Sequence, residues 1–169
     1  MTDTLLLIEA EIPRLRRFAR YLLREPDRAD DLVQDTLCRA IDRLSTWEQG
    51  TNLRAWLFII MRNLYINGLR RARRTPDSVA VAEDDAAMAV PGGQEARVAF
   101  IDLRSALQQL PEGQREILLL VVVEGFTYEE AAGILEVPLG TVRSRVARAR
   151  TALRALLDGE LADWAEAVQ

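Results

Sequence analysis

Five arginines lie close together near the C-terminal end of the chain, in a stretch from Leu139 to Leu157 that contains no acidic residue. They are Arg143, Arg145, Arg148, Arg150 and Arg154. Arginine side chains bind the phosphates of nucleic acid, and small polar side chains fit against base edges in a groove. The predicted chemistry of this stretch is recognition of DNA, with no bond made or broken.

A helix is the element that must present these side chains. At ~100° per residue, apolar residues recur every three or four positions and predict one buried face. That face consists of Val142, Val146, Ala149, Leu153 and Leu156. Small polar and basic residues lie on the opposite face, as entry into a major groove requires. The candidate DNA-contacting residues are Thr141, Arg143, Ser144, Arg145, Ala147 and Arg148.

A shorter helix and a tight turn precede the basic helix. Thr127 and Glu130 have the spacing of a capping box, which starts a helix by satisfying its first backbone N–H groups. Pro138 lacks an N–H donor and biases the preceding residue out of helical angles, so Glu136-Val137-Pro138 ends this helix. The pattern predicts a helix-turn-helix. The alternative is an ordinary helical hairpin with a solvated basic face.

The first half of the chain carries an acidic helix over residues 30–44. Its expected buried face consists of Val33, Leu37, Ala40, Ile41 and Leu44. Another face carries acidic residues with two neighbours, namely Asp31, Asp35 and Asp42 beside Gln34 and Cys38. We interpret this face as a docking surface for a basic protein partner. A solvated acidic helix face is the alternative.

A further helix, over residues 56–74, begins strongly apolar and ends strongly basic. Four arginines lie in its last five residues, at positions 70, 71, 73 and 74, and Arg62 and Asn63 lie one to two turns earlier. Cations at a helix C-terminus complement the helix dipole. Four of them exceed what the dipole needs, so we interpret this end as a surface that follows a phosphate backbone.

The composition excludes several kinds of site. All 22 basic residues are arginine, histidine is absent, and Cys38 is the single cysteine. These residues offer no zinc cluster or cysteine–histidine pair, so we expect no metal, no cofactor and no enzyme activity. Cys38 is expected to be a half-buried helix residue in a reducing compartment. The net charge of −4 argues against indiscriminate binding to nucleic acid.

The organisation predicted is an all-α fold of two small helical domains joined by a flexible acidic linker. The domains are residues 1–74 and 98–157, the linker is 75–97, and an acidic tail occupies 158–169 as a frayed or docking helix. In the second domain we expect a helix near 100–109 and another from Pro111 through Val123. The longest apolar run, 117–123, is too short to cross a bilayer, and the N-terminus lacks a signal-peptide pattern, which favours a cytoplasmic protein without membrane insertion.

Three spaced motifs together resemble the extracytoplasmic-function class of bacterial RNA polymerase sigma factors. The motifs are DDLVQDTLCRA at 30–40, TNLRAWLFIIMRNLYINGLRR at 51–71, and LPEGQREILLLVVVEGFTYEEAAGILEVPLGTVRSRVARAR at 110–150. The helix-turn-helix alone would also fit a response-regulator output domain. The resemblance covers nearly the whole chain outside the linker and the tail.

The resemblance implies that the first domain is sigma region 2 and the second is sigma region 4. Region 2 would dock on the clamp helices of the largest polymerase subunit through Asp31, Gln34 and Asp35. Region 4 would sit on the flap of the second largest subunit. Core RNA polymerase and promoter DNA are therefore the expected partners, and an anti-sigma factor is a further candidate.

The same resemblance implies two DNA surfaces. Region 4 would read the −35 promoter element with Arg143, Ser144, Ala147 and Arg148. Region 2 would open the −10 element, and its loop at 45–53 together with Asn63 resembles a pocket for a flipped base. The candidate −10 residues are Gly50, Thr51, Asn52, Arg62, Asn63, Arg70 and Arg71.

Two departures and two rival functions accompany the resemblance. Asn67 stands where many relatives have aspartate, and Glu136 occupies a turn position often held by glycine. A sigma-like adaptor or mimic that binds a regulator is one rival, but it would be free to lose the arginine clusters that are present here. A plain helix-turn-helix repressor is the other, and it leaves the acidic helix and the residue 56–63 segment unexplained.

Overall fold

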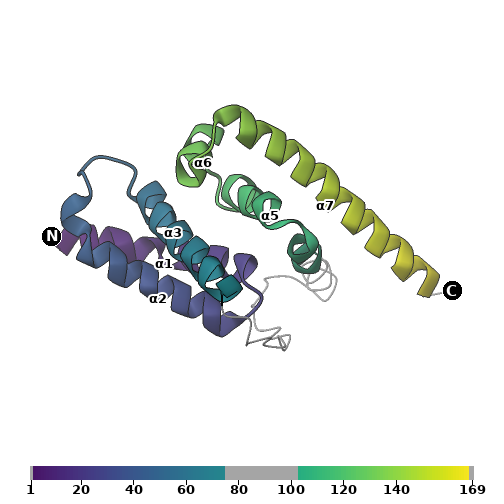
Figure 1. The fold of residues 1–169 in the computed structure, drawn as a ribbon, viewed down its shortest axis with the longest axis horizontal. Helices are drawn as coiled ribbons and strands as arrows, with labels where there is room; N and C mark the ends of the chain where they lie inside the picture. The colour runs from purple at the N-terminus through teal and green to yellow at the C-terminus, as the bar shows by residue number, and fades with distance from the viewer. Residues whose placement is uncertain (1, 75–102, 168–169) are drawn as a thin grey trace.

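The computed structural model describes residues 2–74 and 103–167, with side chains described for 4–74 and 103–158 (Figure 1). The first half consists of α1 (Thr2–Leu22), α2 (Pro26–Asp42), a 3-10 turn η1 (Leu44–Thr46) and α3 (Leu53–Arg74). The predicted linker, residues 75–97, lies outside the described residues.

The three helices of the first half enclose one apolar core. Leu15, Phe18, Leu57, Phe58 and Met61 are among its most deeply buried side chains. The rings of Phe18 and Phe58 meet edge to face with 5.1 Å between their centroids, an arrangement that the charge distribution of aromatic rings favours. This contact joins α1 to α3 and fixes the helix that carries the candidate −10 residues.

The second half contains the predicted helix-turn-helix. Residues 103–109 are helical, followed by α5 (Glu112–Leu118), the π-helical segment η2 (Leu119–Val123), α6 (Tyr128–Leu135) and α7 (Leu139–Ala167). Figure 1 shows α7 as a long helix on the outer side of α5 and α6. Its stripe of Val142, Val146 and Ala149 is buried against them, as the periodicity predicts.

The capping box at the start of α6 is confirmed. The backbone N–H of Glu130 donates to Thr127 Oγ1 at 3.1 Å, and the backbone N–H of Thr127 donates to Glu130 Oε2 at 2.9 Å. The helix ends at Glu136, whose φ of 52° is the only positive value at a non-glycine residue in the described part of the chain. This left-handed conformation is the physical reason why glycine suits the position.

The two halves pack against each other across an aromatic contact. Phe126, which follows η2, lies edge to face with Phe58 of α3, with 5.0 Å between the ring centroids, and both side chains are buried. The all-α fold with two helical domains is confirmed, and no strand occurs among residues 2–74 and 103–167. Across the same ranges, no helix is long and apolar enough to cross a membrane.

Two expectations about local structure are wrong. Ile41 is 54% exposed, because the buried face of α2 is formed by Ala29, Leu32, Val33, Thr36 and Ala40. Cys38 is exposed rather than half-buried, since it lies on the acidic side of that helix. The helix after Pro111 extends through Val123 as predicted, with a change from α-helix to π-helix at Leu119.

The acidic tail continues α7 without a break at Asp158. The helix runs on through Ala167. The predicted boundary at residue 157 therefore falls inside a helix, and the tail is an extension of the second half's last element.

Replacing Glu136 with glycine is expected to stabilise the helix-turn-helix. A left-handed conformation costs a residue with a Cβ atom roughly 1–2 kcal/mol, and glycine removes that cost at an entropic penalty of about 0.5–1 kcal/mol. The net gain should be about 0.5–1 kcal/mol, measured by urea unfolding. Glu136→Ala is the control, since it removes the charge but keeps the Cβ atom. An equal gain from both variants would assign the effect to charge instead of backbone geometry.

Candidate nucleic-acid interface

The first turns of α7 present the candidate −35 residues on an open face. Arg143, Ser144, Ala147 and Arg148 are exposed, whereas Thr141 is half-buried. The Arg148 Nε atom donates to the Ser144 carbonyl oxygen at 3.3 Å, so its side chain lies back along its own helix. Among the described residues, the side-chain hydrogen bonds of Ser144 and Arg148 all lie within α7, so they can be exchanged for contacts to a ligand.

Arg145 differs from the other members of that set. It is half-buried, and its positive charge acts on the buried carboxyl of Glu116 in α5. One of its guanidinium nitrogens lies 3.9 Å from the place a Cβ atom would take at Gly113. Arg145 therefore interacts with the interior of the second half and also lies on the basic face.

The loop before α3 is built by turns and a helix cap. Gly50 has φ of 91°, which a side chain would strain, and Thr51 Oγ1 donates to the Glu48 carbonyl oxygen at 2.7 Å. Asn52 Oδ1 accepts the backbone N–H of Ala55 at 3.0 Å and so caps α3. Its Nδ2 donates to Glu130 Oε1 of α6 at 2.6 Å. The side-chain oxygen of Asn52 therefore caps α3, while its side-chain nitrogen binds α6.

The remaining candidate −10 residues are spread along α3 and do not form one cluster. Asn63 is exposed in the middle of the helix, while Arg70 and Arg71 are exposed at its C-terminal end. At 1.5 Å per residue, Asn52 and Arg70 are ~27 Å apart along the axis. A ligand that contacts the whole set must lie along the helix, which suits a nucleic-acid strand better than a small molecule.

Arg62 is paired across the two halves of the chain. Its Nε donates to Glu116 Oε1 at 3.0 Å, and both side chains are largely buried, with 18% and 6% of their surface exposed. Burial raises the pKa of the Glu116 carboxyl, because desolvation outweighs the opposing attraction of Arg62. This candidate −10 residue is not exposed in the structure.

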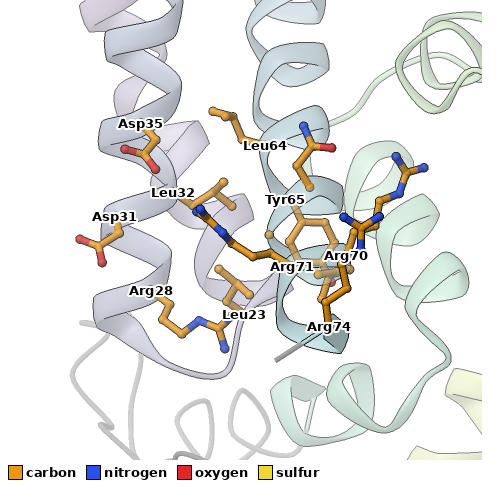
Figure 2. Close-up of a pocket in the computed structure, with 13 residues that line it drawn as sticks. Leu23, Arg28, Asp31, Leu32, Asp35, Leu64, Tyr65, Arg70, Arg71 and Arg74 are labelled. Atoms are coloured by element: carbon orange, nitrogen blue, oxygen red, sulfur yellow. The ribbon is translucent and has the colours of Figure 1, made fainter. Parts of the chain in front are cut away.

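The acidic face of α2 borders a groove. Asp31, Gln34 and Asp35 are exposed, and the two aspartates line a groove of about 660 Å³ between α2 and α3. The buried residues Leu32 and Tyr65 also line it. Figure 2 shows Asp31 and Asp35 one turn apart on α2, with Arg71 extending from α3 towards that helix. The groove therefore presents both signs of charge, with Asp31, Asp35 and Arg28 on α2 and arginines alone among the charged residues on α3.

Sequence reasoning missed a second buried glutamate. The Glu124 side chain has no exposed surface, yet Arg17 of α1 binds both of its oxygens, with Nε–Oε1 at 3.0 Å and Nη2–Oε2 at 2.9 Å. This hydrogen bonding raises the pKa of Arg17. Arg54 of α3 also contacts Glu124, through its carboxylate and its backbone carbonyl. The signal in the sequence is that Glu116 and Glu124 flank a wholly apolar run.

Comparisons with known proteins agree with this arrangement. Residues 100–153 match the family described as Sigma-70, region 4, and residues 8–62 match the Sigma2 domain of PhyR. The chain is 46% identical over 150 residues to the ECF RNA polymerase sigma factor EcfG of Rhodopseudomonas palustris, covering 89% of this chain and 82% of that one. It is 36% identical over 141 residues to the ECF sigma factor SigC of Mycobacterium tuberculosis, covering 82% and 75%.

Solved structures are similar as well. The sigma factor RpoE from Bartonella quintana, in complex with the anti-sigma factor NepR, has a TM-score of 0.80 and 38% identity, over 94% of this chain and 98% of that one. CnrH in complex with the cytosolic domain of CnrY has a TM-score of 0.67 and 29% identity, over 91% and 86%. The likeness to RpoE extends over both helical halves.

Glu116→Gln is expected to remove part of the pH dependence of stability. Because burial raises the pKa of Glu116 above its ordinary value of 4.5, the folded state holds this proton more tightly than the unfolded chain does. The stabilisation that the protonated Glu116 gives the folded state is complete below a pH of 4.5 and is lost as the pH rises through the raised pKa. The free energy of unfolding of the wild-type protein minus that of the variant should therefore fall across this window, measured by urea unfolding at stepped pH.

The matched control is Glu129→Gln, which removes an exposed carboxylate from α6. Its stability should follow that of the wild-type protein across the same window. A wild-type advantage that grew with rising pH would mean that attraction to Arg62 outweighs the burial of Glu116.

Proposed function

Since the chain belongs to the extracytoplasmic-function class of RNA polymerase sigma factors and acts in transcription initiation, we propose that it directs core polymerase to promoters through three separate surfaces. Residues 1–74 form region 2 and residues 98–157 form region 4, joined by the tether at 75–97. The exposed polar and basic face of α7, behind a capped α6, is the observation that carries the proposal.

The first surface reads the −35 element. Arg143, Ser144, Ala147 and Arg148 project from the first turns of α7, where a recognition helix makes its base contacts. Arginine recognises guanine in the major groove through two hydrogen bonds, and small side chains allow the helix to approach closely. Arg150 and Arg154 lie further along α7 and bind phosphates, which contribute affinity without sequence preference.

The second surface holds the opened −10 element. The loop at Gly50, Thr51 and Asn52, together with Asn63, captures an unstacked base, and the arginines of α3 follow the strand. Capturing an unstacked base offsets the few kcal/mol that unstacking costs. Arg70 and Arg71 are exposed at the end of α3, in keeping with backbone contacts.

The third surface docks on the polymerase. Asp31, Gln34 and Asp35 form an exposed acidic edge on α2, which suits a basic surface on the clamp helices of the largest subunit. Region 4 takes the flap of the second largest subunit. The chain itself makes and breaks no bond in this scheme, so it is a specificity subunit and not an enzyme.

An anti-sigma factor is a further proposed partner. The similarity to RpoE in complex with NepR extends over 94% of this chain. It supports the proposal that an anti-sigma factor holds this protein in an arrangement close to the one described here.

The match of residues 8–62 to the Sigma2 domain of PhyR keeps the mimic as a second candidate. A mimic binds a regulator but never engages promoters. Reconstitution with core polymerase separates the two functions, because a sigma factor yields promoter-directed transcripts, from the promoter upstream of its own gene for example, and a mimic yields none.

Reversing the charge of Asp31 and Asp35 together to arginine is expected to abolish co-purification with core polymerase. Both side chains are exposed, so helix content measured by circular dichroism should be unchanged. The matched control reverses Glu9 of α1 and Glu129 of α6, two exposed acids outside the acidic face of α2, and should still co-purify. Retained polymerase binding by Asp31→Arg/Asp35→Arg would reduce this edge to a solvated helix face.

Arg148→Ala is expected to weaken promoter recognition by roughly 1–3 kcal/mol and to relax the preference at one or two −35 positions. The measurement is holoenzyme selection from a promoter library randomised in the −35 element. Arg154→Ala is the comparison, since loss of a phosphate contact should weaken all sequences alike. An unchanged −35 preference would remove Arg148 from base reading.

A further inference from the structure

The Glu124 carboxylate is the most completely buried charge between the two domains. It comes from the end of η2 in the second domain, while both of its guanidinium partners, Arg17 and Arg54, belong to the first. Arg54 also lies over the Phe126 ring, with 4.3 Å from its guanidinium carbon to the ring centroid. A charge buried in this way is tolerated only because its partners neutralise it, and it becomes costly when one partner is removed.

Two further carboxylates from the second domain bind donors of the first. Glu116 receives the Arg62 guanidinium, and Glu130 receives the Asn52 amide at 2.6 Å. Arg62 and Asn52 are the side chains assigned above to the −10 element. A carboxylate offers such donors anionic oxygens of the same kind as a phosphate, so contact with a strand and contact with these glutamates exclude each other.

The face of α7 is not covered by this interface. Its −35 residues are exposed while Arg62 is held inward. Figure 1 shows α7 on the side of α5 and α6 that faces away from α1–α3. The contact therefore engages two of the −10 residues and leaves the −35 residues exposed.

From these contacts we propose that Glu124, with Glu116 and Glu130, latches the two domains in a closed form that inhibits the free protein by engaging two donors of its −10 surface, Asn52 and Arg62. Opening requires the Arg17–Glu124 pair to separate, after which Asn52 and Arg62 can contact a strand. The inhibitory half of this inference rests on the proposed function, because it needs those two side chains to bind DNA.

The experiment compares Arg17→Glu with Arg16→Glu in the full chain. Both variants reverse one arginine on α1, but Arg16 is exposed and lies outside the latch, whereas Arg17→Glu places a second carboxylate against Glu124. Domain separation is measured by energy transfer between dyes on Cys38, an exposed thiol on α2, and on Ala155→Cys of α7. Binding is measured with a fluorescent single-stranded DNA of mixed sequence.

Arg17→Glu is expected to lower the energy transfer and to tighten binding to the DNA probe by roughly 10-fold or more, since the apparent dissociation constant varies inversely with the open fraction. Arg16→Glu should change neither readout in this direction. A second pair, Glu124→Gln with Glu129→Gln as its control, should show the same contrast with a smaller amplitude. If Arg17→Glu loses helix content, the comparison of Glu124→Gln with Glu129→Gln tests the latch instead.

Unchanged energy transfer in both Arg17→Glu and Glu124→Gln would overturn the latch. Lower energy transfer without tighter DNA binding would overturn the inhibition. Neither result depends on the polymerase, so each is distinct from a failure of promoter-directed transcription, which would count against the proposed function itself.

Discussion

The arrangement of the two domains depends on a buried negative charge that neither domain can neutralise alone. Glu124 projects from the second domain and finds its positive partners in α1 and α3 of the first. Apolar contact between Phe58 and Phe126 supplies the burial, and the same burial removes water from the carboxylate. Attraction and desolvation oppose each other in such a pair, and removing one partner leaves a buried charge without compensation.

One side chain links DNA-reading geometry to domain packing. Glu130 closes the capping box that starts α6, and its other carboxylate oxygen accepts the Asn52 amide from the loop before α3. Asn52 in turn caps α3. The beginnings of two helices in two domains are therefore joined through a single carboxylate. A change in the loop can reach the helix-turn-helix without passing through the hydrophobic core.

Local elements of this fold could be predicted from the sequence because their determinants are local. The Thr127–Glu130 cap, the Pro138 turn and the buried stripe of α7 each depend on residues a few positions apart. The partners of Glu116 and Glu124 could not be predicted, since Arg62 and Arg17 lie far away in the chain and no periodicity connects them. The exposure of Ile41 was missed because the packing of α2 against its neighbours, and not its own pattern, selects the buried face.

The π-helical segment before the helix-turn-helix sets the direction in which the residues and helices after it point. In η2 the backbone N–H of Glu124 reaches back five residues, to the carbonyl of Leu119 at 2.9 Å, where an α-helix would reach back four. Each residue of an α-helix turns the next by ~100°, so one extra residue in the turn resets the direction of everything after it. Removing a single residue from this apolar run would turn Glu124 away from the arginines and aim α6 and α7 along a different axis. The spacing between Glu116 and Glu124 is therefore a structural constraint in its own right, which a substitution leaves unchanged and a deletion alters.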